Sequence, residues 1–187
     1  MKFPFNLIVL DLETSGGKTR DTRIVEVGAV AQDEDLNEIG CYEALIDGRP
    51  MTPEASEVNH ITDEMLIGKP TWAEGHKPFV EWCNQFRPYV LGTWSDFDTS
   101  VLRPEYDRLG IRYPHPGHAW DVKSIVWYEC LKKEFPSKTF PVDRACEILN
   151  VPFEGQKHRA LPDARMEAKL HKMVVMSGAV PLPKRMW

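Results

Sequence analysis

The sequence has few cysteines, and they lack the spacing of a metal site or a disulfide framework. Cys41, Cys83, Cys130 and Cys146 lie far apart, with no C-x-x-C pair and no close histidine partner. A disulfide framework is typical of much smaller secreted domains. We therefore expect four reduced thiols, most of them buried.

Long apolar runs are missing as well. No stretch of 18 apolar residues occurs, and the N-terminal residues do not have the basic-then-apolar layout of a signal peptide. The sequence also has no internal repeat and no low-complexity tract. We expect a cytoplasmic protein with no membrane partner.

Positive charge is not in excess, because 23 Lys and Arg residues face 28 Asp and Glu residues, for a formal net charge of −5. This balance argues against a generally basic protein that coats nucleic acid. A length of 187 residues, with 42% hydrophobic and 27% charged residues, is typical of one globular domain. We place that domain at residues 1–177 and expect an irregular C-terminal tail at residues 178–187.

What the sequence does contain is a series of apolar runs separated by turn residues. The first run, Leu7 to Leu10, is typical of a strand buried on both faces. Three strands followed by strands that alternate with helices predict an α/β fold with a central mixed five-stranded sheet flanked by helices. The expected further strands are 24–31, 38–46, 89–94 and 119–122. One helix is expected to begin at Pro53 and another to end at Leu131, and the other expected helices cover 71–87, 98–109, 141–150 and 161–176. Pro104 is expected in the first turn of the helix 98–109.

Asp11 and Glu13 come at the C-terminal end of the first strand. Residues two apart in a strand point to the same face, so both carboxylates share one side of the sheet. Two like charges held so close are costly unless a cation lies between them. The D-x-E pattern itself is expected about once by chance, and it is the position at the carboxyl edge of a buried strand that indicates a ligand site.

A second acidic group follows the fourth strand and is placed to reach the same edge. The segment Trp94-Ser95-Asp96-Phe97-Asp98 offers two candidates. We favour Asp98, because it opens the helix that carries Leu102 and Tyr106, and Asp96 is the alternative. Either aspartate alone would also be an ordinary helix cap.

The third group is formed by His158, in a loop after Gly155, and Asp163, in the first turn of the last helix. A loop histidine placed one helical turn before an inward-facing aspartate is suited to proton transfer beside a metal site. Taken alone, the pattern also fits a histidine that is simply exposed to solvent.

The order, spacing and placement of these groups resemble the DnaQ-like 3′-5′ exonuclease family, DEDDh subgroup, of the ribonuclease H-like superfamily. The family's three motifs match Asp11-Leu12-Glu13-Thr14, the Asp98 segment, and His158 through Asp163. The resemblance covers residues 5–176. Asn59-His60-Ile61-Thr62 resembles the segment that many members place against the terminal nucleotide. Pro162 departs from the family, which more often has an acidic or polar residue before the last aspartate.

The resemblance implies a ribonuclease H-like fold and hydrolysis of phosphodiester bonds at the 3′ ends of single-stranded DNA or RNA, with release of nucleoside 5′-monophosphates. It also implies two Mg²⁺ or Mn²⁺ ions about 3.5–4 Å apart. Hard carboxylate oxygens are suitable ligands for these ions, whereas the cysteines are not.

The family's residue roles carry over as expectations. Asp11 would bridge the two ions, and Glu13, Asp98 and Asp163 would complete the ligand set. His158 would act as general base, so activity should rise with pH as the imidazole loses its proton. The expected contacts to the terminal nucleotide are made by Thr14, His60 and Ile61.

Other functions stay open at this point. The enzyme could act strictly on RNA, as an exoribonuclease or oligoribonuclease, because no residue clearly reads the 2′-hydroxyl. An inactive nucleic-acid-binding domain is a different class, against which the retention of four carboxylates and a histidine argues. A sugar or nucleotide hydrolase on an unrelated α/β fold is a further alternative. The sequence indicates no protein partner and no oligomeric state.

Charge is distributed unevenly along the chain. Residues 156–187 hold seven Lys and Arg residues against Asp163 and Glu167, whereas residues 1–155 are acidic overall. Because the basic segment supplies His158 and Asp163, we expect it to attract a phosphate backbone.

Overall fold

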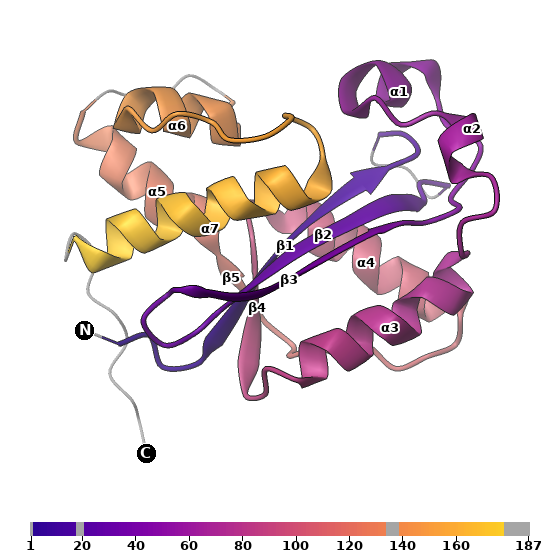
Figure 1. The fold of residues 1–187 in the computed structure, drawn as a ribbon, viewed down its shortest axis with the longest axis horizontal. Helices are drawn as coiled ribbons and strands as arrows, with labels where there is room; N and C mark the ends of the chain where they lie inside the picture. Colours follow the sequence, from indigo (N-terminus) through magenta and orange to yellow (C-terminus); the bar gives the residue numbers. More distant parts are fainter. Residues whose placement is uncertain (1, 18–20, 134–138, 178–187) are drawn as a thin grey trace.

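The computed structural model describes residues 2–17, 21–133 and 139–177. Its centre is a mixed five-stranded sheet in the order β3-β2-β1-β4-β5 (Figure 1). The strands are β1 (Asn6–Thr14), β2 (Ile24–Gln32), β3 (Glu38–Leu45), β4 (Tyr89–Thr93) and β5 (Ala119–Asp121). The first three form an antiparallel meander, and β1, β4 and β5 run parallel. The predicted sheet is therefore confirmed.

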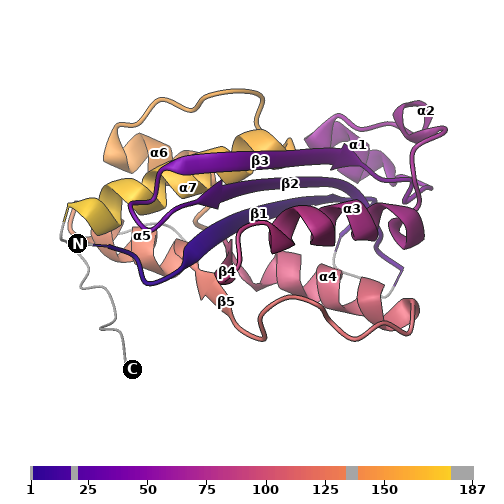
Figure 2. The ribbon, with the colours of Figure 1, turned by 60° about the horizontal axis from the view of Figure 1, so that its bottom comes forward.

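Helices cover both faces of this sheet (Figure 2). One face is covered by α3 (Trp72–Asn84) and α4 (Asp96–Arg108), and the other by α5 (Val122–Leu131) and α7 (Ala160–Met176). The helix α6 (Val142–Leu149) packs against α5 and α7. Two short helices, α1 (Pro53–Asn59) and α2 (Asp63–Leu66), lie beyond the C-terminal end of β1 (Figure 1).

The alternation of side chains along β1 decides which helices each residue meets. Ile8, Leu10 and Leu12 pack in the core cluster that includes residues of α3 and α4. Leu7 and Val9 point to the opposite face and pack with residues of α7. Asp11 and Glu13 continue this second row, because residues two apart share a face. The carboxylates therefore point towards α7.

Two details of the helices differ from the sequence prediction. The helix α4 begins at Asp96, where the Ser95 side chain caps it by accepting a hydrogen bond from the backbone N–H of Phe97. Pro104 consequently lies in the interior of α4 and not in its first turn. The helix continues through the missing N–H because the side chains of Leu102 and Tyr106, on either side of the proline, are fully buried. The four-residue helix α2 was not predicted.

Other predictions concern the cysteines and the chain ends. All four cysteines are free, and three of them are buried, as predicted, with Cys41 exposed. The predicted tail, residues 178–187, lies outside the described residues. None of the helices in the described part of the chain is long and apolar enough to cross a membrane.

Candidate active site

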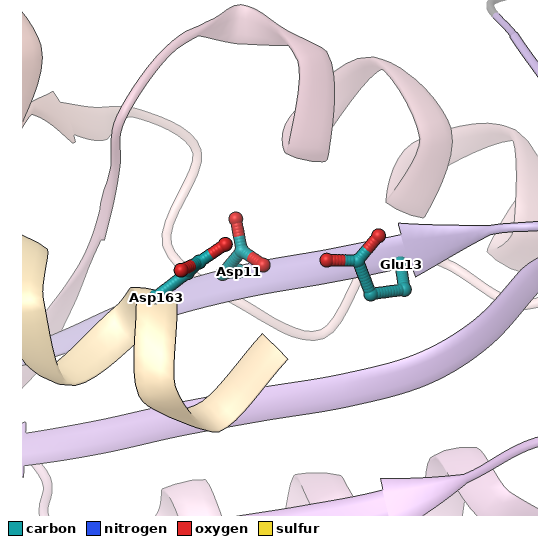
Figure 3. Close-up of side chains that lie close together, drawn as sticks. All are labelled: Asp11, Glu13 and Asp163. Carbon is teal, nitrogen blue, oxygen red and sulfur yellow. The ribbon is translucent and has the colours of Figure 1, made fainter. Parts of the chain in front are cut away.

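Three of the predicted carboxylates converge where β1 passes beneath the start of α7. Asp11, Glu13 and Asp163 each offer an oxygen atom, and these atoms all lie within 4.8 Å of one another. Figure 3 shows the three side chains turned towards a common space, two from the strand and one from the helix. This juxtaposition joins residues 150 positions apart and depends on how closely α7 approaches the sheet.

Gly28 permits that close approach. It lies opposite Asp11 in the antiparallel register of β1 and β2. A Cβ atom at this position would lie 2.1 Å from the backbone carbon of Ala160 and 2.1 Å from the backbone nitrogen of Leu161. Only glycine leaves room for the first turn of α7 to rest on the sheet here. Asp163 is thereby brought over the carboxylates of β1.

Asp98 reaches the site from α4. The pairing of β1 with β4 ends at Val9, so beyond this point the edge of β1 that faces away from β2 is not paired with β4. The Oδ1 atom of Asp98 accepts a hydrogen bond of 3.1 Å from the backbone N–H of Leu12. Asp98 is 4% exposed, whereas Asp96 is exposed. Of the two sequence candidates, Asp98 is the one that the structure brings to the other carboxylates.

These residues line a cavity of about 280 Å³. Its lining includes six carboxylates, and also His158, Lys157 and aromatic side chains such as that of Phe97. Lys157 does not neutralise the centre of the cavity, because its ammonium group pairs with Asp143 at 3.1 Å. The carboxylates are Asp11, Glu13, Asp98, Asp143, Asp163 and Glu167.

Burial and mutual repulsion raise the pKa values of the two carboxyl groups on β1. The pKa of Asp11 lies well above its ordinary value, chiefly because of burial and then because of the charges of Asp98 and Glu167. Burial, followed by the charge of Asp163, raises the pKa of Glu13 to about 8. Both raised pKa values mean that the cavity disfavours the charged forms of these carboxyl groups.

The other two predicted ligands show the same effect, partly offset by hydrogen bonds. Burial raises the pKa of Asp98 to about 7 although the Leu12 N–H stabilises its charged form. Burial also raises the pKa of Asp163 to about 6, against the hydrogen bond that its Oδ2 accepts from the backbone N–H of His158 at 3.0 Å.

The donor set fits a divalent cation. The Oδ2 atom of Asp11 is buried and has no hydrogen-bond partner among the described residues. Carboxylate oxygens are hard ligands of the kind that Mg²⁺ and Mn²⁺ prefer. A cation between Asp11, Glu13 and Asp163 would give the orphaned oxygen a partner and would offset the repulsion that raises the pKa values.

His158 lies at the edge of this cavity in a loop that precedes α7. Its backbone is in the left-handed region, with φ at 58°, and its side chain is exposed. His158 is thus among the residues that line the cavity, together with the predicted carboxylates.

The three residues predicted to contact the terminal nucleotide, Thr14, His60 and Ile61, lie in different surroundings. Thr14 lines a second groove, which shares Leu12, Glu13 and Phe97 with the first cavity and is therefore adjacent to it. Its hydroxyl donates a hydrogen bond of 2.7 Å to the backbone carbonyl of Gly16. The second groove runs along the side of α1.

The burial of Ile61 argues against the predicted contact of its side chain with the terminal nucleotide. Its side chain is 0% exposed and packs in a small core cluster with Val25 and Leu66, so no surface is left for a base. His60 is exposed at the C-terminal cap of α1 and lines neither groove, and its contact with a nucleotide stays a prediction.

The described part of the basic segment, residues 156–177, does not form the free positive surface that the net charge of the segment predicts. Within the described residues, each of its cations already contacts an acceptor from another part of the chain, so the segment does not present a free positive surface. These contacts are Lys157 with Asp143, Arg159 with Glu26, Arg165 with Glu38, Lys169 with Glu154, and Lys172 with the side-chain oxygen of Asn37. Lys184 and Arg185 lie outside the described residues.

No role at the site was predicted from the sequence for Asn59, beyond its place in the Asn59-His60-Ile61-Thr62 segment, or for Glu167. Asn59 is buried, donates to the backbone carbonyl of Thr14 at 3.2 Å, and hydrogen-bonds the carboxyl group of Glu13. Glu167 lines the cavity one helical turn after Asp163. The signal for Glu167 was its spacing of four residues from Asp163, which places both on one face of a helix.

A family model described as RNase_T, exonuclease, matches residues 8–171 of the chain. The DNA polymerase III subunit epsilon of Treponema pallidum (strain Nichols) is 36% identical over 101 residues, which cover 51% of this chain and 43% of the relative. The same subunit of Pasteurella multocida (strain Pm70) is 25% identical over 182 residues, which cover 94% of this chain and 69% of the relative.

The fold has close neighbours among solved structures. The nuclease domain of 3′hExo, a DEDDh family member solved bound to rAMP, has a TM-score of 0.80 at 16% identity, and the match covers 98% of both chains. The predicted ribonuclease H-like fold is thereby confirmed. Exonucleases of this family generally use divalent metal ions, in agreement with the carboxylate cluster. Because the family model extends from β1 to α7 and so includes every carboxylate of the site, the chain belongs to the RNase_T exonuclease family, and its resemblance to DnaQ-like exonucleases of the DEDDh subgroup is confirmed.

Proposed function

We propose that this protein removes nucleotides one at a time from the 3′ end of single-stranded DNA or RNA and releases nucleoside 5′-monophosphates. The observation that carries the proposal is the convergence of Asp11, Glu13 and Asp163 within 4.8 Å, beside the buried Asp98 and a loop histidine. A cluster of this kind is suited to hold two divalent ions, Mg²⁺ or Mn²⁺, which supply a nucleophilic water at neutral pH and stabilise the leaving oxygen.

We assign the metal ligands and the general base to residues of the chain itself. Asp11 would bridge the two ions, because both Asp98 of α4 and Asp163 of α7 act on its charge, and Glu13, Asp98 and Asp163 would complete the ligand set. His158 would accept the proton of the attacking water, because it lines the cavity and its side chain can act as a general base. Its backbone N–H meanwhile fixes the orientation of the Asp163 carboxylate.

The second groove is the proposed place of the terminal nucleotide. It is adjacent to the metal cavity, and its lining includes Thr14, Gly16, Gly17 and residues of α1. Phe97 lines both the first cavity and the second groove, and its ring offers an aromatic surface to a base. Stacking of this kind tolerates any base, which suits an enzyme that degrades a strand without sequence preference.

The names of the relatives and the ligand of the structural neighbour point to both DNA and RNA. The curated relatives are DNA polymerase III subunits, whereas the 3′hExo nuclease domain was solved with rAMP. Strict action on RNA is therefore the second candidate.

The test uses 5′-labelled single-stranded DNA and RNA of equal sequence, incubated with the protein and Mg²⁺, Mn²⁺ or EDTA. We expect a ladder that shortens from the 3′ end and disappears with EDTA or with Asp11→Ala. Cleavage of RNA alone would establish the exoribonuclease alternative. A protein that retards both strands on a gel but shortens neither would be a binding domain, and the proposal would be wrong.

The two aspartates of α4 provide a matched pair of variants. Asp98→Asn keeps a side-chain oxygen for the Leu12 N–H but removes the buried charge, and it should lower the rate by more than about a hundredfold. Asp96→Asn makes the same chemical change at an exposed position two residues away and should leave the rate within about twofold of the wild-type rate.

A further inference from the structure

Glu167 is a buried carboxylate that the ligand set described above does not use. It lies one turn after Asp163 on the same face of α7, and it is 1% exposed. Its side chain lines the cavity together with Asp11, Asp98 and Asp163. Its Oε2 atom has no hydrogen-bond partner among the described residues. An acidic oxygen buried in this way is costly unless something compensates it.

No basic group in the described part of the chain provides that compensation. Glu167 forms no ion pair there. The next titratable side chain on its face of α7 is His171, whose Nε2 accepts a hydrogen bond of 2.9 Å from the indole N–H of Trp120. An imidazole that accepts through Nε2 is neutral, and burial lowers the pKa of His171 to about 4. The imidazole therefore carries no positive charge towards Glu167.

The charge of Glu167 instead acts on the predicted ligands. After burial and Asp98, it contributes to the raised pKa of Asp11, and Asp98 and Asp163 in turn act on Glu167. A divalent cation among these groups would offset the repulsion between all of them at once.

We propose that Glu167 belongs to the metal centre as a fifth carboxylate, a positioning residue that strengthens the binding of a divalent cation by Asp11, Asp98 and Asp163. This inference rests on the proposed function, because it requires that the cavity bind metal. It has a consequence that a purely structural role does not share. Glu167 should destabilise the metal-free protein, in which burial and the neighbouring carboxylates disfavour its charged form, and stabilise the metal-loaded one.

The test measures two properties of the full chain, the Kd for Mn²⁺ by calorimetry and the midpoint temperature of unfolding in EDTA. Glu167→Gln keeps the size and removes the charge, and it should weaken Mn²⁺ binding by about tenfold. The same variant should unfold at a higher temperature than wild type in EDTA. Glu167→Leu provides a second variant without a polar group and should change both properties in the same directions.

Glu105→Gln is the matched control. Glu105 is also buried, at 4% exposure, but it pairs with Arg108 at 2.8 Å on α4 and does not line the cavity. This control should unfold at a lower temperature than wild type in EDTA and should bind Mn²⁺ with wild-type affinity.

Three results would overturn the inference. The first is wild-type Mn²⁺ affinity in both folded Glu167 variants, and the second is a loss of stability of both variants in EDTA, which would indicate a structural role. The third is a wild-type protein that binds no Mn²⁺, and this result would overturn the proposed metal centre as well. The first two leave the proposed function intact, so the two failures are distinguishable.

Discussion

Glu26 on β2 and Arg159 at the start of α7 form an ion pair that anchors the residue next to His158. The side chain of Glu26 is fully buried, and both of its oxygens accept hydrogen bonds from the Arg159 guanidinium, with Nε at 3.1 and 3.0 Å. Oε2 also accepts the backbone N–H of Ala160 at 3.0 Å. In the sheet, Glu26 lies opposite Glu13. The pair therefore ties the beginning of α7 to the strand beside the metal cavity.

Glu26→Gln should lower both stability and activity. The amide oxygen can still accept one hydrogen bond, but the charged interaction is lost and Arg159 is left poorly paired. We expect a loss of about 2 kcal/mol in the free energy of unfolding, measured by urea denaturation. The control is Glu38→Gln, which breaks another strand-to-α7 pair, Glu38 with Arg165 at 3.0 Å, whose side chains are 44% and 46% exposed. Its cost should be below about 1 kcal/mol, and equal losses in both variants would contradict the role given to Glu26.

Gly28→Ala should displace the start of α7. The added Cβ would meet backbone atoms of Ala160 and Leu161, which cannot move aside as a flexible side chain can. We expect a loss of about 3 kcal/mol in the free energy of unfolding and weaker Mn²⁺ binding, because Asp163 would shift away from Asp11. Gly117→Ala is the control, since no atom lies within 4 Å of its Cβ position, and it should change stability by no more than about 0.5 kcal/mol. Wild-type stability of Gly28→Ala would show that α7 does not approach the sheet this closely.

The predictions that succeeded depend on local geometry. Asp11 and Glu13 share a face because alternation along a strand does not depend on what surrounds it. The choice of Asp98 over Asp96 followed from the position of the apolar residues on α4, and the structure buries Asp98 accordingly. Asp163 was expected in the first turn of the last helix, and α7 begins at Ala160.

The predictions that failed depend on contacts between distant parts of the chain. Ile61 looked available to a base, and only the packing of the segment after α1 against Val25 shows that it belongs to the core. The basic residues of the last segment were expected to attract phosphate, but those in the described part of the chain pair with acceptors that lie outside the segment, on the sheet, on α6 and in the loops beside them. Glu167 was only counted in the charge of the last segment, because its burial depends on how α7 lies across β1.

Stability of the metal-free protein should fall as pH rises from about 6.5 to 8. The pKa values of Asp98 and Glu13 are raised to about 7 and about 8 from 3.8 and 4.5. Over this range the folded state therefore binds more protons than the unfolded state, and ionisation costs stability. Buried His115 and His171, with pKa values lowered to about 4, act in the opposite direction, but only below about pH 6.5, where the unfolded histidines are protonated.

The measurement is the midpoint temperature of unfolding in EDTA at several pH values. We expect wild type to lose stability between pH 6.5 and 8, and Asp98→Asn to lose less, because one of the titrating groups is gone. Saturating Mn²⁺ should abolish most of the decline, since the cation replaces the protons. A midpoint in EDTA that rises over this pH range would contradict the raised pKa values.

Replacing His158 should remove the general base while leaving the metal centre in place. The Asp163 carboxylate is held by the backbone N–H of His158, which every substitution except proline retains. Asn is the best replacement, because the backbone φ of 58° is in the left-handed region that Asn tolerates. His158→Asn should lower kcat by about a hundredfold to ten-thousandfold, keep the Kd for Mn²⁺, and lose the rise of the rate with pH that an imidazole base produces.

The matched comparison is His60→Asn, the same change at a second exposed histidine with a left-handed backbone, at φ 59°. His60 lies at the end of α1 and outside both grooves, so its replacement removes no group from the metal cavity. If the predicted contact with the terminal nucleotide exists, this variant should raise KM and leave the pH profile of kcat unchanged. A parallel fall of kcat in both variants, with the pH profile retained in each, would mean that His158 contributes to binding or folding and that the proton of the attacking water goes elsewhere.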